Sequence, residues 1–157
     1  MNPFIPYGKQ SIDKSDIDAV IEALRSDFIT TGPKVSEFER AVCDFTGAKY
    51  ASAVSSGTAA LHCAMFAAGI KDEDEVIVTP MTFAASVNAV LYCGGTPVFA
   101  DVISETLLIN PDEVEKKITS KTKAVAAVDY AGQPCDYDAL KEICKKHGLF
   151  LISDTCH

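Results

Sequence analysis

The residues with the clearest chemical potential follow the ends of apolar segments. Residues 149–153 read LFLIS, a run typical of a buried strand; Asp154 comes directly after it, and His157 follows three residues later. An acid at the end of a central strand is partly removed from water, so its charged form needs a cationic partner. A protonated heteroaromatic nitrogen is one such partner. The simpler interpretation is that Asp154 caps the next turn.

A second candidate is the turn SSGT, which joins an apolar stretch to an alanine-rich helical pattern. Gly57 would let the backbone turn tightly there, and free N–H groups at the helix start, together with the positive end of the helix dipole, could hold a phosphate group. The simpler interpretation is an ordinary serine or threonine cap at the start of a helix.

A third candidate is Phe83, which lies in the stretch TPMTFAAS just beyond another apolar run. An aromatic side chain at that point could stack on a planar ligand. Alternatively, Phe83 packs into the core from the start of a helix.

The elements that must position these residues alternate between short apolar runs and helical patterns. The predicted strands are 50–54, 75–79, 96–102, 123–130 and 149–153. The predicted helices between them are 58–68, 83–92, 110–118 and 137–147. This alternation predicts an α/β fold with a mostly parallel sheet covered by helices on both faces. In such sheets, ligands bind beyond the carboxyl ends of the strands, where all three candidate turns lie.

The chain begins with a different pattern, and we predict a boundary near residue 48. Residues 1–48 are predicted to form an N-terminal arm and two helices, and residues 49–157 the first part of a larger domain. The first helix is expected to begin at Ser15 and Asp16 and the second to end at Gly47.

Composition excludes several classes of protein. The formal net charge of the 157 residues is −8, which argues against a nucleic-acid binder. No signal peptide and no apolar run of membrane-spanning length is predicted. The six cysteines include no CxxC pair, which favours free thiols in a reducing cytoplasm. Cys63 and Cys144 are predicted to be core residues, and no metal site is expected because Cys156 and His157 lack further ligands.

Together the three turns fit one cofactor, pyridoxal 5'-phosphate. Its phosphate would lie at the helix start near Gly57, its ring against Phe83, and its pyridine nitrogen against Asp154. The acid would keep that nitrogen protonated, so that the ring can absorb electrons from a substrate carbanion. The chain contains neither GxGxxG nor GxxxxGK[ST], so a dinucleotide site and a Walker ATPase are unsupported.

Several stretches also resemble a known family: IPYGKQSI, LRSDFITTGPKVSEFE, AVSSGTAALHCA, AGQP and ISDTCH. They are similar to the N-terminal part of the DegT/DnrJ/StrS sugar-nucleotide aminotransferases, which are fold-type I pyridoxal-phosphate enzymes. Within that family, the sequence of these stretches most resembles the pseudaminic-acid branch. The resemblance implies the three-layer, mostly parallel sheet of the PLP-dependent transferase large domain, incomplete at the C-terminus. It also implies a homodimer when full length and amino transfer from glutamate to a UDP-linked 4-keto-6-deoxy sugar.

The resemblance assigns roles to individual positions. Gly57 and Thr58 match the phosphate-binding turn, and Phe83 matches the aromatic residue that stacks on the ring. Asp154 matches the acid that pairs with the pyridine nitrogen. His157 matches a position next to the phenolic oxygen of the cofactor.

Two further positions match regions that approach the sugar nucleotide, Tyr7 and Thr31. In the family, the lysine that forms the Schiff base lies shortly beyond the segment that matches residues 154–157. No lysine of this chain is expected at the carboxyl edge of the sheet. The chain is therefore expected to be an N-terminal fragment that is inactive and poorly soluble by itself.

Three alternatives remain at this level. A member of the same family could carry histidine at the lysine position and dehydrate sugars instead. The chain could be a truncated protein that only dimerises or regulates. It could also be a nucleotide-binding α/β module, although the glycine fingerprint of such modules is missing.

Overall fold

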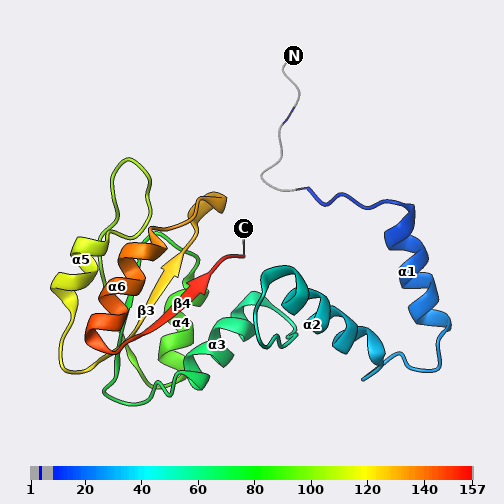
Figure 1. The fold of residues 1–157 in the computed structure, drawn as a ribbon, viewed down its shortest axis with the longest axis horizontal. Coiled ribbons are helices and arrows are strands. Elements are labelled where there is room, and N and C mark those ends of the chain that lie inside the picture. The colour runs from blue at the N-terminus through cyan, green and yellow to red at the C-terminus, as the bar shows by residue number, and fades with distance from the viewer. Residues whose placement is uncertain (1–3, 5–8, 157) are drawn as a thin grey trace. The chain divides into compact units, whose positions relative to one another are not determined.

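The computed structural model describes Phe4 and residues 9–156, and the chain divides into two units on either side of the Ala53–Val54 bond (Figure 1). The first unit is helical, and the second contains a sheet with helices around it. The predicted boundary near residue 48 lies slightly earlier in the chain.

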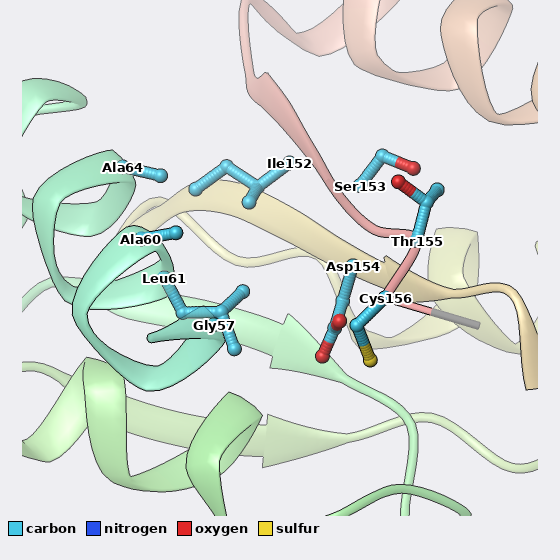
Figure 2. Close-up of a pocket in the computed structure, with 9 residues that line it drawn as sticks. All are labelled: Gly57, Ala60, Leu61, Ala64, Ile152, Ser153, Asp154, Thr155 and Cys156. Atoms are coloured by element: carbon cyan, nitrogen blue, oxygen red, sulfur yellow. The ribbon is translucent and has the colours of Figure 1, made fainter. Parts of the chain in front are cut away.

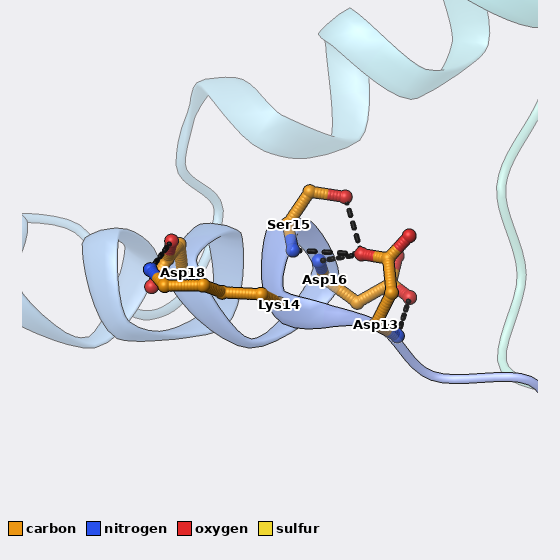
Figure 3. A network of polar contacts seen from close by, with 5 residues as sticks. All are labelled: Asp13, Lys14, Ser15, Asp16 and Asp18. Carbon is orange, nitrogen blue, oxygen red and sulfur yellow. Dashed lines mark hydrogen bonds and ion pairs between the residues drawn. The ribbon is translucent and has the colours of Figure 1, made fainter.

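In the first unit, α1 (Lys14–Arg25) begins with a capping box. The Asp13 carboxylate accepts hydrogen bonds from the backbone N–H groups of Ser15 at 2.7 Å and Asp16 at 3.3 Å. In return, the Asp16 carboxylate accepts from the Asp13 N–H at 2.9 Å (Figure 3). The predicted start at Ser15 and Asp16 is therefore close to the observed one.

The second helix of this unit is α2 (Pro33–Thr46). Pro33 stands in its first turn, where a missing N–H costs nothing. Gly47 ends it with φ +73°, the left-handed conformation that glycine adopts without strain. The predicted end at Gly47 is confirmed. Neither α1 nor α2 contains a buried residue within the described structure.

The second unit contains four strands that pair in parallel in the order β2-β1-β3-β4. They are β1 (Glu75–Val78), β2 (Thr96–Phe99), β3 (Thr122–Val128) and β4 (Phe150–Asp154). Each overlaps a predicted strand, because long apolar runs between turns are a strong signal. Asp154, expected just after the last strand, is its final residue.

Helices cover both faces of this sheet (Figure 1). They are α3 (Gly57–Ala67), α4 (Ala84–Tyr92), α5 (Pro111–Lys117), the 3₁₀ turn η1 (Tyr130–Gly132) and α6 (Tyr137–His147). One apolar cluster joins α3 and α4 to Val76 and Val78, and the other joins α5 and α6 to Ile77. Neighbouring strand residues thus point into opposite layers. The predicted three-layer α/β fold is confirmed.

One predicted strand is wrong. Residues 50–54 form no strand, and the described sheet has four strands rather than five. A strand is stable only when its backbone groups pair with a neighbour, and this segment pairs with neither β2 nor β4. The Ala53 N–H instead donates to Oε1 of Glu39 at 2.9 Å, and Tyr50 is 78% exposed.

The cysteines divide between core and surface. Cys144 is buried, as predicted, but Cys63 is exposed because it lies on a face of α3 that the described residues leave uncovered. All six cysteines are free thiols in the described structure. Among the described helices, none has the length and apolar character needed to cross a bilayer.

Candidate functional site

A pocket of about 300 Å³ opens between the start of α3 and the end of β4 (Figure 2). It lies within the second unit. Its lining residues come from these two elements and from the two residues after β4: Gly57, Ala60, Leu61, Ala64, Ile152, Ser153, Asp154, Thr155 and Cys156. The pocket therefore brings together two of the turns that the sequence singled out.

Asp154 supplies the carboxylate of this pocket because of its position in β4. Ile152 packs against the α3 and α4 cluster, and Leu151 packs against the α5 and α6 cluster. Asp154 has the same parity as Ile152, so its side chain turns to the α3 and α4 side. Figure 2 shows the carboxylate pointing away from the Ser153 side chain.

A buried hydroxyl holds one oxygen of this carboxylate. Ser86 lies on α4, is fully buried, and donates from Oγ to Oδ2 of Asp154 at 2.8 Å. Oγ1 of Thr82 lies 2.7 Å from Oγ of Ser86. Neither hydroxyl is among the site residues predicted from the sequence. The available signal was a serine in the mostly apolar pattern of residues 84–92, which also contains Asn88.

The other end of the pocket is the beginning of α3. Ser56 is the N-cap, and its side chain accepts from the Ala59 N–H at 3.1 Å. The N–H groups of Gly57 and Thr58 have no hydrogen-bond partner among the residues that the structure describes. They stand at the positive end of the helix dipole, so this end of the pocket favours an anion.

Gly57 is not required by the fold around it. Its φ lies outside the left-handed region, and an added Cβ would meet no atom within 4 Å. The expected tight turn at Gly57 is thus not what demands a glycine. Because Gly57 lines the pocket, a side chain there would occupy space beside the free N–H groups.

Cys156 also lines the pocket and lies close to Asp154 (Figure 2). Partial desolvation, followed by hydrogen bonding to and repulsion from the Asp154 carboxylate, raises the pKa of the Cys156 thiol. A raised pKa keeps the thiol protonated near neutral pH, and the thiolate is the reactive form. The pocket therefore contains an acid but no activated cysteine nucleophile.

The structure places the predicted aromatic residue apart from this pocket lining. Phe83 is the N-cap residue of α4 and is 78% exposed. It is not among the residues that line the pocket, so its stacking role stays a prediction.

The structure does not place the remaining predicted residues in the pocket with Asp154. Tyr7 and His157 lie outside the described residues. Thr31 belongs to the first unit, where it has φ +50° and lines a groove of about 230 Å³ between α1 and α2. Its sugar-binding role also stays a prediction.

Lysines are missing from the pocket lining within the described part of the second unit. Lys71 precedes β1, and Lys123 lies near the start of β3, so both are at the amino edge of the sheet. Lys116 and Lys146 are on helices and pair with glutamates. These four lysines thus lie away from the pocket, and the expectation that no lysine of the chain reaches the carboxyl edge stays a prediction.

A second polar network lies beside the pocket, around the end of β3. Oδ1 of Asp129 accepts from the Cys135 N–H at 2.9 Å and from the Tyr137 hydroxyl at 2.8 Å. The Tyr137 hydroxyl is also hydrogen-bonded to Oγ of Ser153. The Asp129 N–H donates to the backbone oxygen of Asp154 at 3.0 Å. This network joins the ends of β3 and β4 through their backbone and through the side chains of Tyr137 and Ser153.

The chain matches one family of known proteins over almost its whole length. Residues 10–157 match the profile of the DegT/DnrJ/EryC1/StrS aminotransferase family. The chain is 46% identical over 156 residues to the spore coat polysaccharide biosynthesis protein SpsC of Bacillus subtilis. That match covers 99% of this chain and 40% of SpsC.

Solved structures show the same fold. The PLP form of the putative sugar aminotransferase Spr1654 from Streptococcus pneumoniae is 35% identical, with a TM-score of 0.90, over 98% of this chain and 43% of that one. Helicobacter pylori PseC, an aminotransferase involved in the biosynthesis of pseudoaminic acid, is 38% identical, with a TM-score of 0.90, over 97% of this chain and 41% of that one. The chain thus spans less than half the length of these relatives.

Proposed function

We propose that this chain, which belongs to the DegT/DnrJ/EryC1/StrS aminotransferase family, forms part of the pyridoxal-phosphate site of a sugar-nucleotide aminotransferase. The observation that carries the proposal is the position of Asp154. Its carboxylate stands in a pocket whose other end is the start of α3, with free N–H groups. An acid and an anion site at two ends of one pocket suit a cofactor with a basic ring nitrogen and a phosphate.

Pyridoxal phosphate is the cofactor that the family and the PLP and PMP forms of Spr1654 indicate. When bound, it supplies a ring that takes up the electron pair released when a substrate C–H bond breaks. The described residues fit this group. The pocket has room beside Gly57 for a phosphate and a single carboxylate for the ring nitrogen.

Each residue of the proposed cofactor site then has a defined role. The N–H groups of Gly57 and Thr58 bind the phosphate, because they are unpaired and stand at the positive end of α3. Asp154 holds a proton on the ring nitrogen through its free oxygen. Phe83 packs against the ring, and His157 lies by the phenolic oxygen; these two assignments rest on the family resemblance.

The proposed substrates are glutamate, as amino donor, and a UDP-linked 4-keto-6-deoxy sugar. Among the family's reactions we favour the UDP-4-amino-4,6-dideoxy-N-acetyl-β-L-altrosamine transaminase of pseudaminic acid biosynthesis. Two observations support this choice: the similarity to PseC and the amino-acid sequence of the stretch SDFITTGP. Tyr7 and Thr31 would approach the sugar nucleotide. We further propose a cytoplasmic homodimer, with the lysine that attaches the cofactor supplied by sequence beyond His157.

The test uses the complete gene product that contains this chain. Reconstituted with pyridoxal phosphate, it is incubated with ¹⁵N-glutamate and the UDP-linked keto sugar. We expect the ¹⁵N atom to appear on C4 of the sugar, as detected by NMR and mass spectrometry. Residues 1–157 expressed alone are the matched control and are expected to transfer no nitrogen.

Two results would overturn the proposal. A sugar product that has lost water and gained no nitrogen would identify a dehydratase instead. Cofactor binding without nitrogen transfer to any UDP-linked keto sugar would exclude the proposed substrate class.

A further inference from the structure

We propose that Ser86 and Thr82 form a hydroxyl relay that positions the Asp154 carboxylate for its cofactor. The inference rests on the proposed function, because it assigns the purpose of the relay to the ring nitrogen of pyridoxal phosphate. Neither hydroxyl lines the pocket, so both would act through Asp154 as positioning residues.

Ser86 is a buried hydroxyl in an apolar layer. It is 0% exposed, and its neighbours on α4, Ala85, Ala89 and Val90, belong to the apolar core. A hydroxyl in such surroundings is unfavourable unless it is hydrogen-bonded, and an alanine would fit the same apolar pattern. The serine therefore has a specific partner, and that partner is Asp154, 68 residues further along the chain.

The two hydrogen bonds of the relay each have a defined direction. A carboxylate only accepts, so Ser86 must use its single proton in the 2.8 Å bond to Oδ2 of Asp154. The contact of 2.7 Å with Thr82 then requires Thr82 to donate to Oγ of Ser86. The order is thus Thr82 to Ser86 to Asp154, and each bond strengthens the next.

The relay restricts the orientation of the Asp154 carboxylate. With Oδ2 held by Ser86, the carboxyl group cannot rotate freely about its Cβ–Cγ bond. The other oxygen, Oδ1, keeps acceptor capacity for a cationic partner in the pocket, because the Cys156 thiol beside the carboxylate is only a weak donor. A carboxylate oriented in advance holds a proton on a ring nitrogen better than one that must reorient when the cofactor binds.

The experiment compares three variants of the complete gene product. Ser86→Ala removes the direct donor. Thr82→Val removes the second hydroxyl while keeping the volume of the side chain. Thr122→Val is the matched control, because Thr122 is also buried and its hydroxyl accepts from the Thr119 N–H at 2.9 Å, but it lies at the amino edge of the sheet.

The main measurement is the ¹⁵N NMR signal of bound pyridoxal phosphate labelled at its ring nitrogen. In Ser86→Ala we expect the signal to move toward the unprotonated form and kcat to fall about tenfold, with KM for glutamate nearly unchanged. Thr82→Val should change both in the same direction by about twofold to threefold. Thr122→Val should lower the unfolding midpoint without moving the ¹⁵N signal.

A second measurement is independent of the cofactor. In the apo protein, the effects of Ser86→Ala and Asp154→Ala on the free energy of unfolding should not add, because each variant removes the same hydrogen bond, whereas those of Thr122→Val and Asp154→Ala should add. Wild-type protein with a protonated ring nitrogen, and the same signal in Ser86→Ala, would overturn the relay while leaving the proposed function intact. Wild-type protein that does not bind pyridoxal phosphate would overturn both.

Discussion

Asp129 and Asp154 stand at the carboxyl ends of the neighbouring parallel strands β3 and β4, yet their surroundings differ. The strands pair in register, with Val128 beside Asp154, and the Asp129 N–H donates to the backbone oxygen of Asp154. Asp129 uses its carboxylate for its own loop. It accepts from Cys135 and Tyr137, six and eight residues further on.

Asp154 accepts from a residue far away in the sequence and faces a pocket. An acid at a strand end is therefore not enough to indicate a binding site. The donors around it decide whether it closes a loop or is available to a ligand. Asp129 is the turn-capping acid that the simpler interpretation of Asp154 described.

The largest expected difference between the two acids is in catalysis. In the complete gene product, Asp154→Asn should reduce amino transfer at least about a hundredfold, because the charged partner of the ring nitrogen is lost. The free energy of unfolding should change by less than about 1 kcal/mol, because asparagine still offers an acceptor to Ser86. Steady-state kinetics and urea denaturation measure the two effects. Activity close to the wild-type level would remove the distinction between the acids.

The second difference is in stability. Asp129→Ala should lower the free energy of unfolding by about 2 kcal/mol, because two hydrogen bonds to a charged acceptor are lost in a partly buried loop. Asp129→Asn keeps an acceptor and serves as the control, with a smaller loss. Urea denaturation measures both variants. The comparison fails if Asp129→Ala is as stable as the wild-type protein.

The smallest expected effect concerns pH. Burial, together with Asp129, raises the pKa of Tyr137 from 10.0 to about 12 and that of Cys135 from 9.0 to about 11. When pH rises through this range, the unfolded chain loses these protons before the folded one does. Stability contributed by the two groups is thus complete below pH 9 and is lost between pH 9 and pH 12.

Tyr137→Phe tests this effect. The variant should lose about 1 kcal/mol of unfolding free energy near neutral pH, where Tyr137 bonds to Asp129. In the wild-type protein, Tyr137 ionises at a lower pH when the chain is unfolded than when it is folded, which lowers the stability of the wild-type protein as pH rises. The variant lacks this loss, so its deficit in unfolding free energy should shrink between pH 10 and pH 12. Urea denaturation at a series of pH values measures the deficit. A deficit that is constant or grows with pH would contradict the assignment.

Much of the fold follows from local patterns. The four observed strands overlap predicted ones, because each is an apolar run between turn residues. Helix ends were also predictable where a specific residue terminates the helix, as Gly47 and Gly148 do with φ of +73° and +68°. The strand predicted at residues 50–54 was wrong, because backbone pairing depends on a neighbouring strand that the segment itself does not specify.

The candidate site was predictable in part. Gly57 and Asp154 come together as expected, although residues 50–54 form no strand, because α3 packs on the face of the sheet to which Ile152 of β4 belongs. Phe83 was expected beside them, but the sequence does not specify how far a helix N-cap residue stands from the pocket. Ser86 was missed because its partner lies 68 residues away.

The sequence by itself therefore determined the family, the alternation of strands and helices, and the acid at the end of β4. Those properties depend on residue types and on spacings within a few residues. Only the tertiary structure decided that Asp154 turns toward α3 and α4 while Ser153 turns toward Tyr137. It also decided that Asp129 is occupied and that Ser86 is the partner of Asp154. These outcomes depend on which layers pack against each face of the sheet, and only the folded chain brings those side chains within hydrogen-bonding distance.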